Sequence, residues 1–276
     1  MRRLTLQELY GLNEFHFSLL YSSFFILHSS LIPYLNLHTH HPLPEGEATI
    51  PAFGLHPWYL DAHLLTDQVA TLKQHLMNDP ADTTNCSLPH RVAREKEVDL
   101  MSSSPSDRGF ARPWSLDTSR TPKPRTDRQG GGSLSLIGEC GLDRLCATPY
   151  DLQLAAFEAQ IALSEELCRP IILHCVRALD DVLRLKRGTK QPWIWHGFRG
   201  KPQQLQQLLD HGFYVSFGFR HHADSLRACP SDRLFLETDD TPTPIAPLYA
   251  TAAGLRATTE DELREQLWDN VNALFH

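Results

Sequence analysis

The sequence has 276 residues, enough for one large domain with a sizeable core, and its 41% hydrophobic and 21% charged residues are ordinary for a globular protein. Its formal net charge of −7 argues against a surface that attracts nucleic acid everywhere, but allows a local positive site or one charged by metal. The six cysteines include no CxxC pair and no disulfide-scaffold spacing, which favours a reducing compartment and therefore a cytoplasmic protein.

Residues 1–33 are predicted to form an N-terminal extension. The segment 15–35 contains no charged residue, as a membrane span or a signal peptide would, but serines, His28 and Pro33 dilute its apolar character. No clear small-residue cleavage site follows it. We therefore favour a segment that packs on the domain or stays partly disordered over one that exports or anchors the chain, and we expect no membrane partner.

A second irregular region runs from about residue 78 to residue 133. It has no apolar periodicity, contains several prolines and ends in three consecutive glycines. Between Arg108 and Arg128 the sequence has six basic and two acidic residues. This excess of positive charge suggests either a nucleic-acid contact or, as we favour, a solvated linker. The pattern predicts a flexible insertion that interrupts a single domain of residues 34–276.

The remainder of the chain alternates short apolar runs with helix-like patterns. The apolar runs predict buried strands at residues 34–37, 52–55, 134–138, 171–174, 193–196, 214–217 and 233–237. Strands that alternate with helices form a parallel sheet, so the pattern predicts an α/β fold.

Three of the predicted helices have readable N-terminal signals. Thr148 and Pro149 have the pattern of an N-cap followed by a first-turn proline. Pro202 opens a second helix, and Thr258 with Asp261 would cap the last one.

Polar side chains stand at the ends of most predicted strands. They are His38 and His40, His56, Glu139, His174, His196 and Asp239. In a barrel of parallel strands these ends converge on the face where catalytic groups lie.

The residue types at these positions suit metal binding. Side chains at i and i+2 of a strand point the same way, so His38 and His40 could bind one ion together. His174 and His196 could hold a second ion, and a carboxylate can bridge two. Asp239 could both contact metal and take a proton from an attacking water.

Each of these residues also has an ordinary interpretation. An HxH motif often caps a loop, Glu139 could start a helix, and His174 beside an apolar run is more often a satisfied core histidine than a ligand. His41 has no partner on its side of the strand and is interpreted as a loop residue. The combination is specific, because six potential ligands, each at the end of a separate strand or in the paired HxH, are hard to collect by chance.

The motifs resemble those of the TatD family of metal-dependent hydrolases. They are NLHTHHP, FGLHPW, IGECGLD, IILHCVRA, WHGFRG, YVSFG, LFLETDD and a final NVNALF, and they cover residues 34–60 and 134–276. The resemblance implies a TIM-barrel-like (β/α) barrel that binds divalent metal, usually two ions (Mg, Mn or Zn), and hydrolyses phosphodiester bonds in DNA. It implies that His38, His40 and Asp239 bind one ion and His174 and His196 the other, that Glu139 bridges them, and that His56 contacts the substrate phosphate.

The sequence departs from the family pattern in three places. Residues 41–55 between the HxH and GxHP motifs are too few for the usual helix, strand and second helix, so we predict that one strand–helix unit is missing and that the barrel is seven-stranded or distorted. Val176 replaces the usual arginine, and DTPTP follows Asp239 where a small residue, proline and a bulky residue are common. These changes affect the substrate-facing wall and leave the ligands intact.

Three functions remain open at this point. The leading hypothesis is a metal-dependent phosphodiesterase or nuclease, with Asp239 and Glu139 as catalytic residues and DNA or a small phosphoester as substrate. The second is an amidohydrolase that acts on a small ester or amide; many such enzymes bridge their metals with a carbamylated lysine, and no lysine stands at a strand end here. The third is a catalytically silent metal-binding barrel.

Overall fold

The computed structural model describes residues 32–78 and 135–275 of the chain. The predicted extension (1–33) and insertion (78–133) lie almost entirely outside these residues, so the prediction of a single interrupted domain stays a prediction. The described residues share one hydrophobic core, to which both parts of the chain contribute.

Six parallel strands pair in chain order. They are β3 (Ala52–Phe53), β4 (Leu136–Asp143), β5 (Ile171–Val176), β6 (Trp193–Trp195), β7 (Tyr214–Phe217) and β8 (Leu234–Leu236). Two further short strands, β1 (Tyr34–Leu35) and β2 (Glu47–Ala48), form a parallel pair beside them. The predicted α/β class with a parallel sheet is confirmed.

Backbone hydrogen bonds join the first strand to the last. The Leu37 amide donates to the Leu236 carbonyl (3.0 Å), and the Asp239 amide donates to the His38 carbonyl (3.1 Å). On the other side β1 pairs with β2, which lies in one short segment with β3. The described residues thus contain eight strands in two sheets, and residues 41–55 hold the strand β2 but no helix, so the predicted loss of a whole strand–helix unit stays a prediction.

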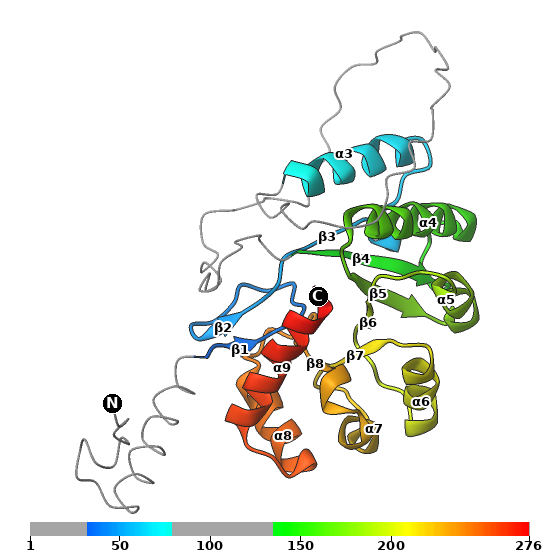
Figure 1. The fold of residues 1–276 in the computed structure, drawn as a ribbon. Coiled ribbons are helices and arrows are strands. Elements are labelled where there is room, and N and C mark those ends of the chain that lie inside the picture. The colour runs from blue at the N-terminus through cyan, green and yellow to red at the C-terminus, as the bar shows by residue number, and fades with distance from the viewer. Residues whose placement is uncertain (1–31, 79–134, 276) are drawn as a thin grey trace, which may run out of the picture.

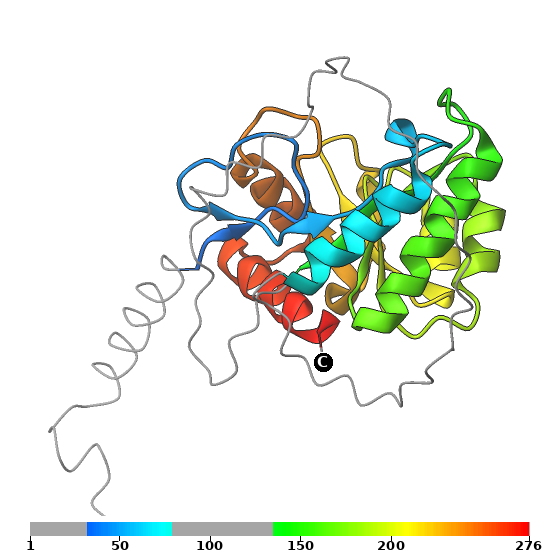
Figure 2. The same ribbon diagram turned by 90° about the horizontal axis from the view of Figure 1, so that it is seen from above.

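The helices lie around the outside of the strands, as Figure 1 shows. They are α3 (Leu65–Asn78), α4 (Tyr150–Leu167), α5 (Leu179–Lys186), α6 (Pro202–Asp210), α7 (Ala223–Ala228), α8 (Ala246–Arg256) and α9 (Glu260–Leu274), with the 3-10 helices η1 (Pro57–Tyr59) and η2 (Ser231–Arg233). Figure 2 shows α3 beside α4, where Lys73 and Glu166 form an ion pair (2.8 Å). None of the helices within the described ranges has both the length and the apolar character of a membrane span.

A buried polar network holds the junction between the first and last strands. The Asn36 side chain donates to Thr238 Oγ1 (2.9 Å) and accepts from the Thr238 amide (3.0 Å). Nearby, the buried Glu47 accepts from the Ile245 amide (2.7 Å). Buried polar groups cost free energy unless they are paired, so these pairings fix one arrangement of the junction.

The sequence-based boundaries agree closely with the structure for most strands, and β7 matches its prediction. The prediction missed β2 and ended the third strand too early, because β4 continues to Asp143. Two helix starts were wrong by one residue: Pro149, not Thr148, is the N-cap of α4, and Thr259, not Thr258, caps α9 through a capping box with Glu262. Helix α6 begins at Pro202 as predicted.

The cysteines are in two states. Cys140, Cys146, Cys175 and Cys229 are free thiols, whereas Cys168 is disulfide-bonded.

Gly141 lies where β4 approaches β5 most closely. Its φ is +144°, and a Cβ there would overlap the carbonyl oxygen of His174. We expect Gly141→Ala to lower the free energy of unfolding by about 2–4 kcal/mol through strain and overpacking. Denaturant unfolding measures this change. Gly254→Ala is the matched control, since a Cβ on this exposed α8 residue meets nothing and should be neutral or slightly stabilising; an equal loss in both variants would contradict the explanation.

Candidate metal centre

The predicted site residues come from six strand positions and meet at the carboxyl ends of the strands. They are His38 and His40 after β1, His56 after β3, Glu139 in β4, His174 in β5, His196 after β6 and Asp239 after β8. All of them belong to groups whose ligand atoms lie within 4.8 Å of one another. The structure therefore brings together every residue proposed from the sequence, although their chemical roles stay predictions.

Glu139 lies at the centre of the cluster, and each of its oxygens faces different histidines. Its Oε2 is 3.0 Å from His38 Nε2 and 3.6 Å from His40 Nε2. Its Oε1 is 2.6 Å from His174 Nδ1 and 2.7 Å from His196 Nε2. One carboxylate thus connects two pairs of imidazoles.

The two imidazole pairs have the spacing of ligands that share an ion. His38 Nε2 lies 3.3 Å from His40 Nε2, and His174 Nδ1 lies 3.4 Å from His196 Nε2. Nitrogen ligands at about 2.0–2.1 Å from one tetrahedral ion are about 3.3 Å apart. Asp239 Oδ1 joins the first pair, at 3.6 Å from His40 Nε2 and 4.0 Å from His38 Nε2.

A buried carboxylate orients the ring of His174. Asp143 Oδ2 lies 3.4 Å from His174 Nε2, on the side of the ring away from Glu139. Asp143 also accepts from Trp58 Nε1 (2.7 Å) and from the Leu145 amide (2.7 Å), which hold its carboxylate in place. A histidine that donates its outer nitrogen to a carboxylate presents a lone pair on the inner one.

The fully buried Glu237 does the same for His196. Its Oε1 lies 3.2 Å from His196 Nδ1 and accepts from the Gly197 amide (2.6 Å). If the outer nitrogen of each histidine donates to its carboxylate and the ring carries a single proton, the inner lone pair faces the negative Glu139. That arrangement is repulsive unless a cation or an extra proton lies between them, and it therefore fits a cation site.

The electrostatics of the cluster favour positive charge. Burial raises the pKa of Glu139, but hydrogen bonds with the four histidines outweigh it and hold the pKa far below its ordinary value. Burial lowers the pKa of His196, yet the carboxylates of Glu237 and Glu139 raise it well above normal overall. Burial raises the pKa of Asp239, which makes this carboxylate a better proton acceptor than an exposed one.

His56 differs from the other histidines in its hydrogen bonding. Its Nδ1 accepts from the Trp58 amide (3.2 Å), which places the proton of the neutral ring on Nε2. That Nε2 lies 3.4 Å from Glu139 Oε1. His56 is thus a hydrogen-bond donor at the edge of the cluster, as a phosphate-binding residue would be.

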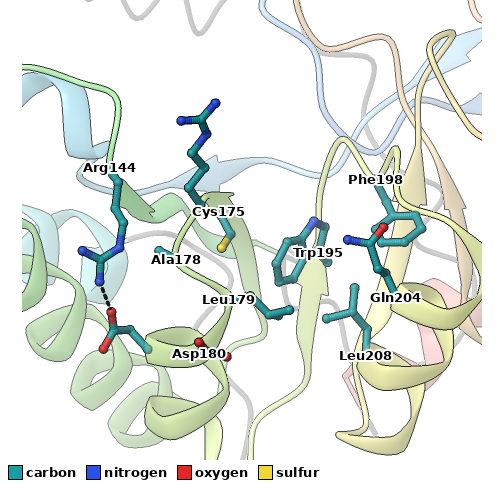
Figure 3. A pocket seen from close by; sticks show the side chains of 11 residues that line it. Arg144, Cys175, Ala178, Leu179, Asp180, Trp195, Phe198, Gln204 and Leu208 are labelled. Carbon is teal, nitrogen blue, oxygen red and sulfur yellow. Dashed lines mark hydrogen bonds and ion pairs between the residues drawn. The ribbon is translucent and has the colours of Figure 1, made fainter.

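A pocket of about 520 Å³ lies between strands β5 and β6 and helices α5 and α6 (Figure 3). Cys175 and Trp195 line it together with residues of α5 and α6. Neighbouring residues of a strand point to opposite faces, so these side chains point away from those of His174 and His196. The pocket therefore belongs to the layer between strands and helices and is separate from the ligand cluster.

Sequence reasoning missed Asp143 and Glu237, the two orienting carboxylates. Both lie inside the quoted motifs IGECGLD and LFLETDD, and Glu237 was interpreted only as a strand end. Each lies at the end of a strand that also carries a predicted metal ligand, and this position could have indicated that they contact the cluster. His41 lies outside the cluster, as expected, and donates to the Asp240 carbonyl (2.9 Å).

Comparison with known proteins identifies the family. Residues 130–276 match the family model described as TatD related DNase, which is more than half of the chain. A "3'-5' ssDNA/RNA exonuclease TatD" of Klebsiella pneumoniae is 33% identical over 174 residues (50% of this chain, 64% of the relative). A protein of the same name from Erwinia amylovora is 30% identical over 196 residues (59% and 73%). An "uncharacterized metal-dependent hydrolase YabD" of Bacillus subtilis is 31% identical over 163 residues (50% and 64%).

Solved structures agree on the fold. The crystal structure of YJJV, a TatD homolog from Escherichia coli K12, matches with a TM-score of 0.55 at 18% sequence identity and covers 96% of this chain and 95% of its own. The chain spans 64% of the length of the Klebsiella and Bacillus relatives that it matches. The resemblance inferred from the motifs is confirmed: the chain belongs to the TatD related DNase family.

Proposed function

We propose that the chain hydrolyses phosphodiester bonds in single-stranded nucleic acid, in the cytoplasm, with two divalent cations (Mg, Mn or Zn) held by the cluster. The observation that carries this proposal is the Glu139 carboxylate between two imidazole pairs, with the inner nitrogens of His174 and His196 close to it and their outer nitrogens beside buried carboxylates. The names of the relatives, which refer to single-stranded DNA and RNA, support the substrate class.

The geometry of the side chains supports a division of roles among them. His38, His40 and Asp239 would hold one cation and His174 and His196 the other, with Glu139 between them. When bound, divalent cations polarise a phosphate oxygen and lower the pKa of a nearby water. The acidic chain thereby gains a local positive site for phosphate.

This chain's own residues then act on the substrate and the water. His56 Nε2 donates to a phosphate oxygen and orients the phosphodiester. Asp239 accepts the proton of the water that attacks phosphorus while the ester P–O bond breaks.

Removal of metal tests the proposal. We expect the protein with added Mn²⁺, Mg²⁺ or Zn²⁺ to shorten an end-labelled single-stranded oligonucleotide, and EDTA to stop the reaction until excess cation is added back. A gel time course measures both effects. Cleavage that is insensitive to EDTA, or its absence from a folded protein that binds metal, would contradict the proposal.

A further inference from the structure

Two exposed aromatic side chains stand beside the cluster. Trp58 is 51% exposed and Tyr59 is 61% exposed, and both belong to η1, which His56 caps. Leu145, two residues after Asp143, is 62% exposed. These three account for most of the large hydrophobic side chains exposed in residues 32–78 and 135–275; the others are Leu64 and Met77.

The position of the Trp58 ring is fixed relative to the cluster. Its only polar atom, Nε1, donates to Asp143 Oδ2 (2.7 Å), so the surface that it leaves to solvent is apolar ring carbon. Its ring centroid lies 4.9 Å from that of His56 and 5.9 Å from that of His174. A hydrogen bond to the carboxylate that orients a predicted ligand thus holds an apolar surface at the edge of the site.

Tyr59 adds a second exposed ring beside it, set at 68° to the ring of Trp58. Its ring centroid lies 5.6 Å from His56 and 6.5 Å from Trp58. No side-chain hydrogen bond of its hydroxyl group is found among the described residues. The two rings flank His56, the residue that would contact the substrate phosphate.

We infer that Trp58 and Tyr59 form a stacking platform for an unpaired nucleobase of the nucleotide whose phosphate lies at the cluster. The inference rests on the proposed function, and it adds the side chains that would make the site prefer single-stranded nucleic acid. An aromatic face stacks on any base, which gives affinity without sequence preference. Bases of a duplex are already stacked on their neighbours, so the platform favours single strands, whose bases can be splayed out.

The test compares two substrates of equal length and charge: fluorescent oligothymidylate and a chain that lacks every base. The Mn²⁺-loaded protein is tested on both, through kcat/KM where cleavage occurs and through fluorescence anisotropy in the same buffer where it does not. We expect a preference of about 5- to 100-fold for the chain with bases. Because binding is measured even without turnover, the preference for the chain with bases can be determined even if the protein does not cleave either chain.

Variants of the platform separate stacking from folding. Tyr59→Leu should reduce the preference at least about fivefold by weakening only the chain with bases, whereas Tyr59→Phe, which keeps the ring, should retain it. Trp58→Leu should reduce it further. Met77→Ala, an equally exposed apolar side chain (51%) on α3, should leave the preference unchanged. The inference would be overturned if the unaltered protein cleaved or bound both oligonucleotides equally well. It would also be overturned if Tyr59→Leu lowered kcat/KM or affinity equally for both.

Discussion

Replacing Glu139 by Gln is expected to reduce phosphodiester cleavage by about 10³-fold or more and metal affinity by at least about 100-fold. Loss of a residue that merely orients a ligand costs about 10–100-fold, and Glu139 contacts both imidazole pairs directly. The Gln side chain would also place its NH₂ group, a hydrogen-bond donor, beside the imidazole nitrogens of one of the two pairs. Isothermal titration with Mn²⁺ and a cleavage assay measure the two effects.

Glu158→Gln is the matched control for the change in net charge. Glu158 lies exposed on α4 and should bind metal and cleave as the unaltered protein does. Normal metal affinity in Glu139→Gln would show that this carboxylate does not bridge cations.

Replacing Asp239 by Asn is expected to lower kcat by about 10²–10⁴-fold, the range for loss of a general base. The amide keeps the shape of the side chain but cannot accept the proton of the attacking water. Asp239 also contacts the His38 and His40 pair, so we expect weaker binding of one cation in addition. Saturating metal should restore binding but not kcat, which steady-state kinetics at high Mn²⁺ concentration can show.

The adjacent Asp240 provides the control, since its side chain is 81% exposed and only reaches 4.0 Å from His40. Asp240→Asn should change kcat less than about threefold, as expected for a solvated carboxylate. If kcat of Asp239→Asn recovers fully in excess metal, its role is that of a ligand alone.

The strands and the residues that meet in the cluster were predictable because each leaves a local signal. Buried parallel strands are short apolar runs, and a polar residue at the end of each run needs no knowledge of its partners to be recognised. The His38 and His40 pair, Glu139 and Asp239 were found in this way. Residues 41–55 were expected to lack a strand, but they contain β2 and no helix, because a two-residue strand needs far less chain than a helix.

The parts that were missed depend on contacts between distant residues. Strand β2 has only two residues and is defined by its pairing with β1. The carboxylate of Asp143 could not be assigned without knowing that Trp58, 85 residues away, and His174 share it. The start of α9 was shifted because Thr258 and Thr259 are both good N-cap residues, and only the bond from the Glu262 amide to Thr259 distinguishes them.

The junction between Asn36 and Thr238 has a consequence for how the protein is made. These residues are 202 positions apart. During synthesis, the strand that leads to His38 and His40 therefore cannot pair with β8 until about 200 further residues have been made. Until then His38 and His40 lack Asp239, and the cluster is incomplete on that side. A ligand that binds only when Asp239 lies beside His38 and His40 would stabilise the pairing of the first and last strands by mass action. Metal supply during biosynthesis would then influence the yield of folded protein, independently of any effect on turnover.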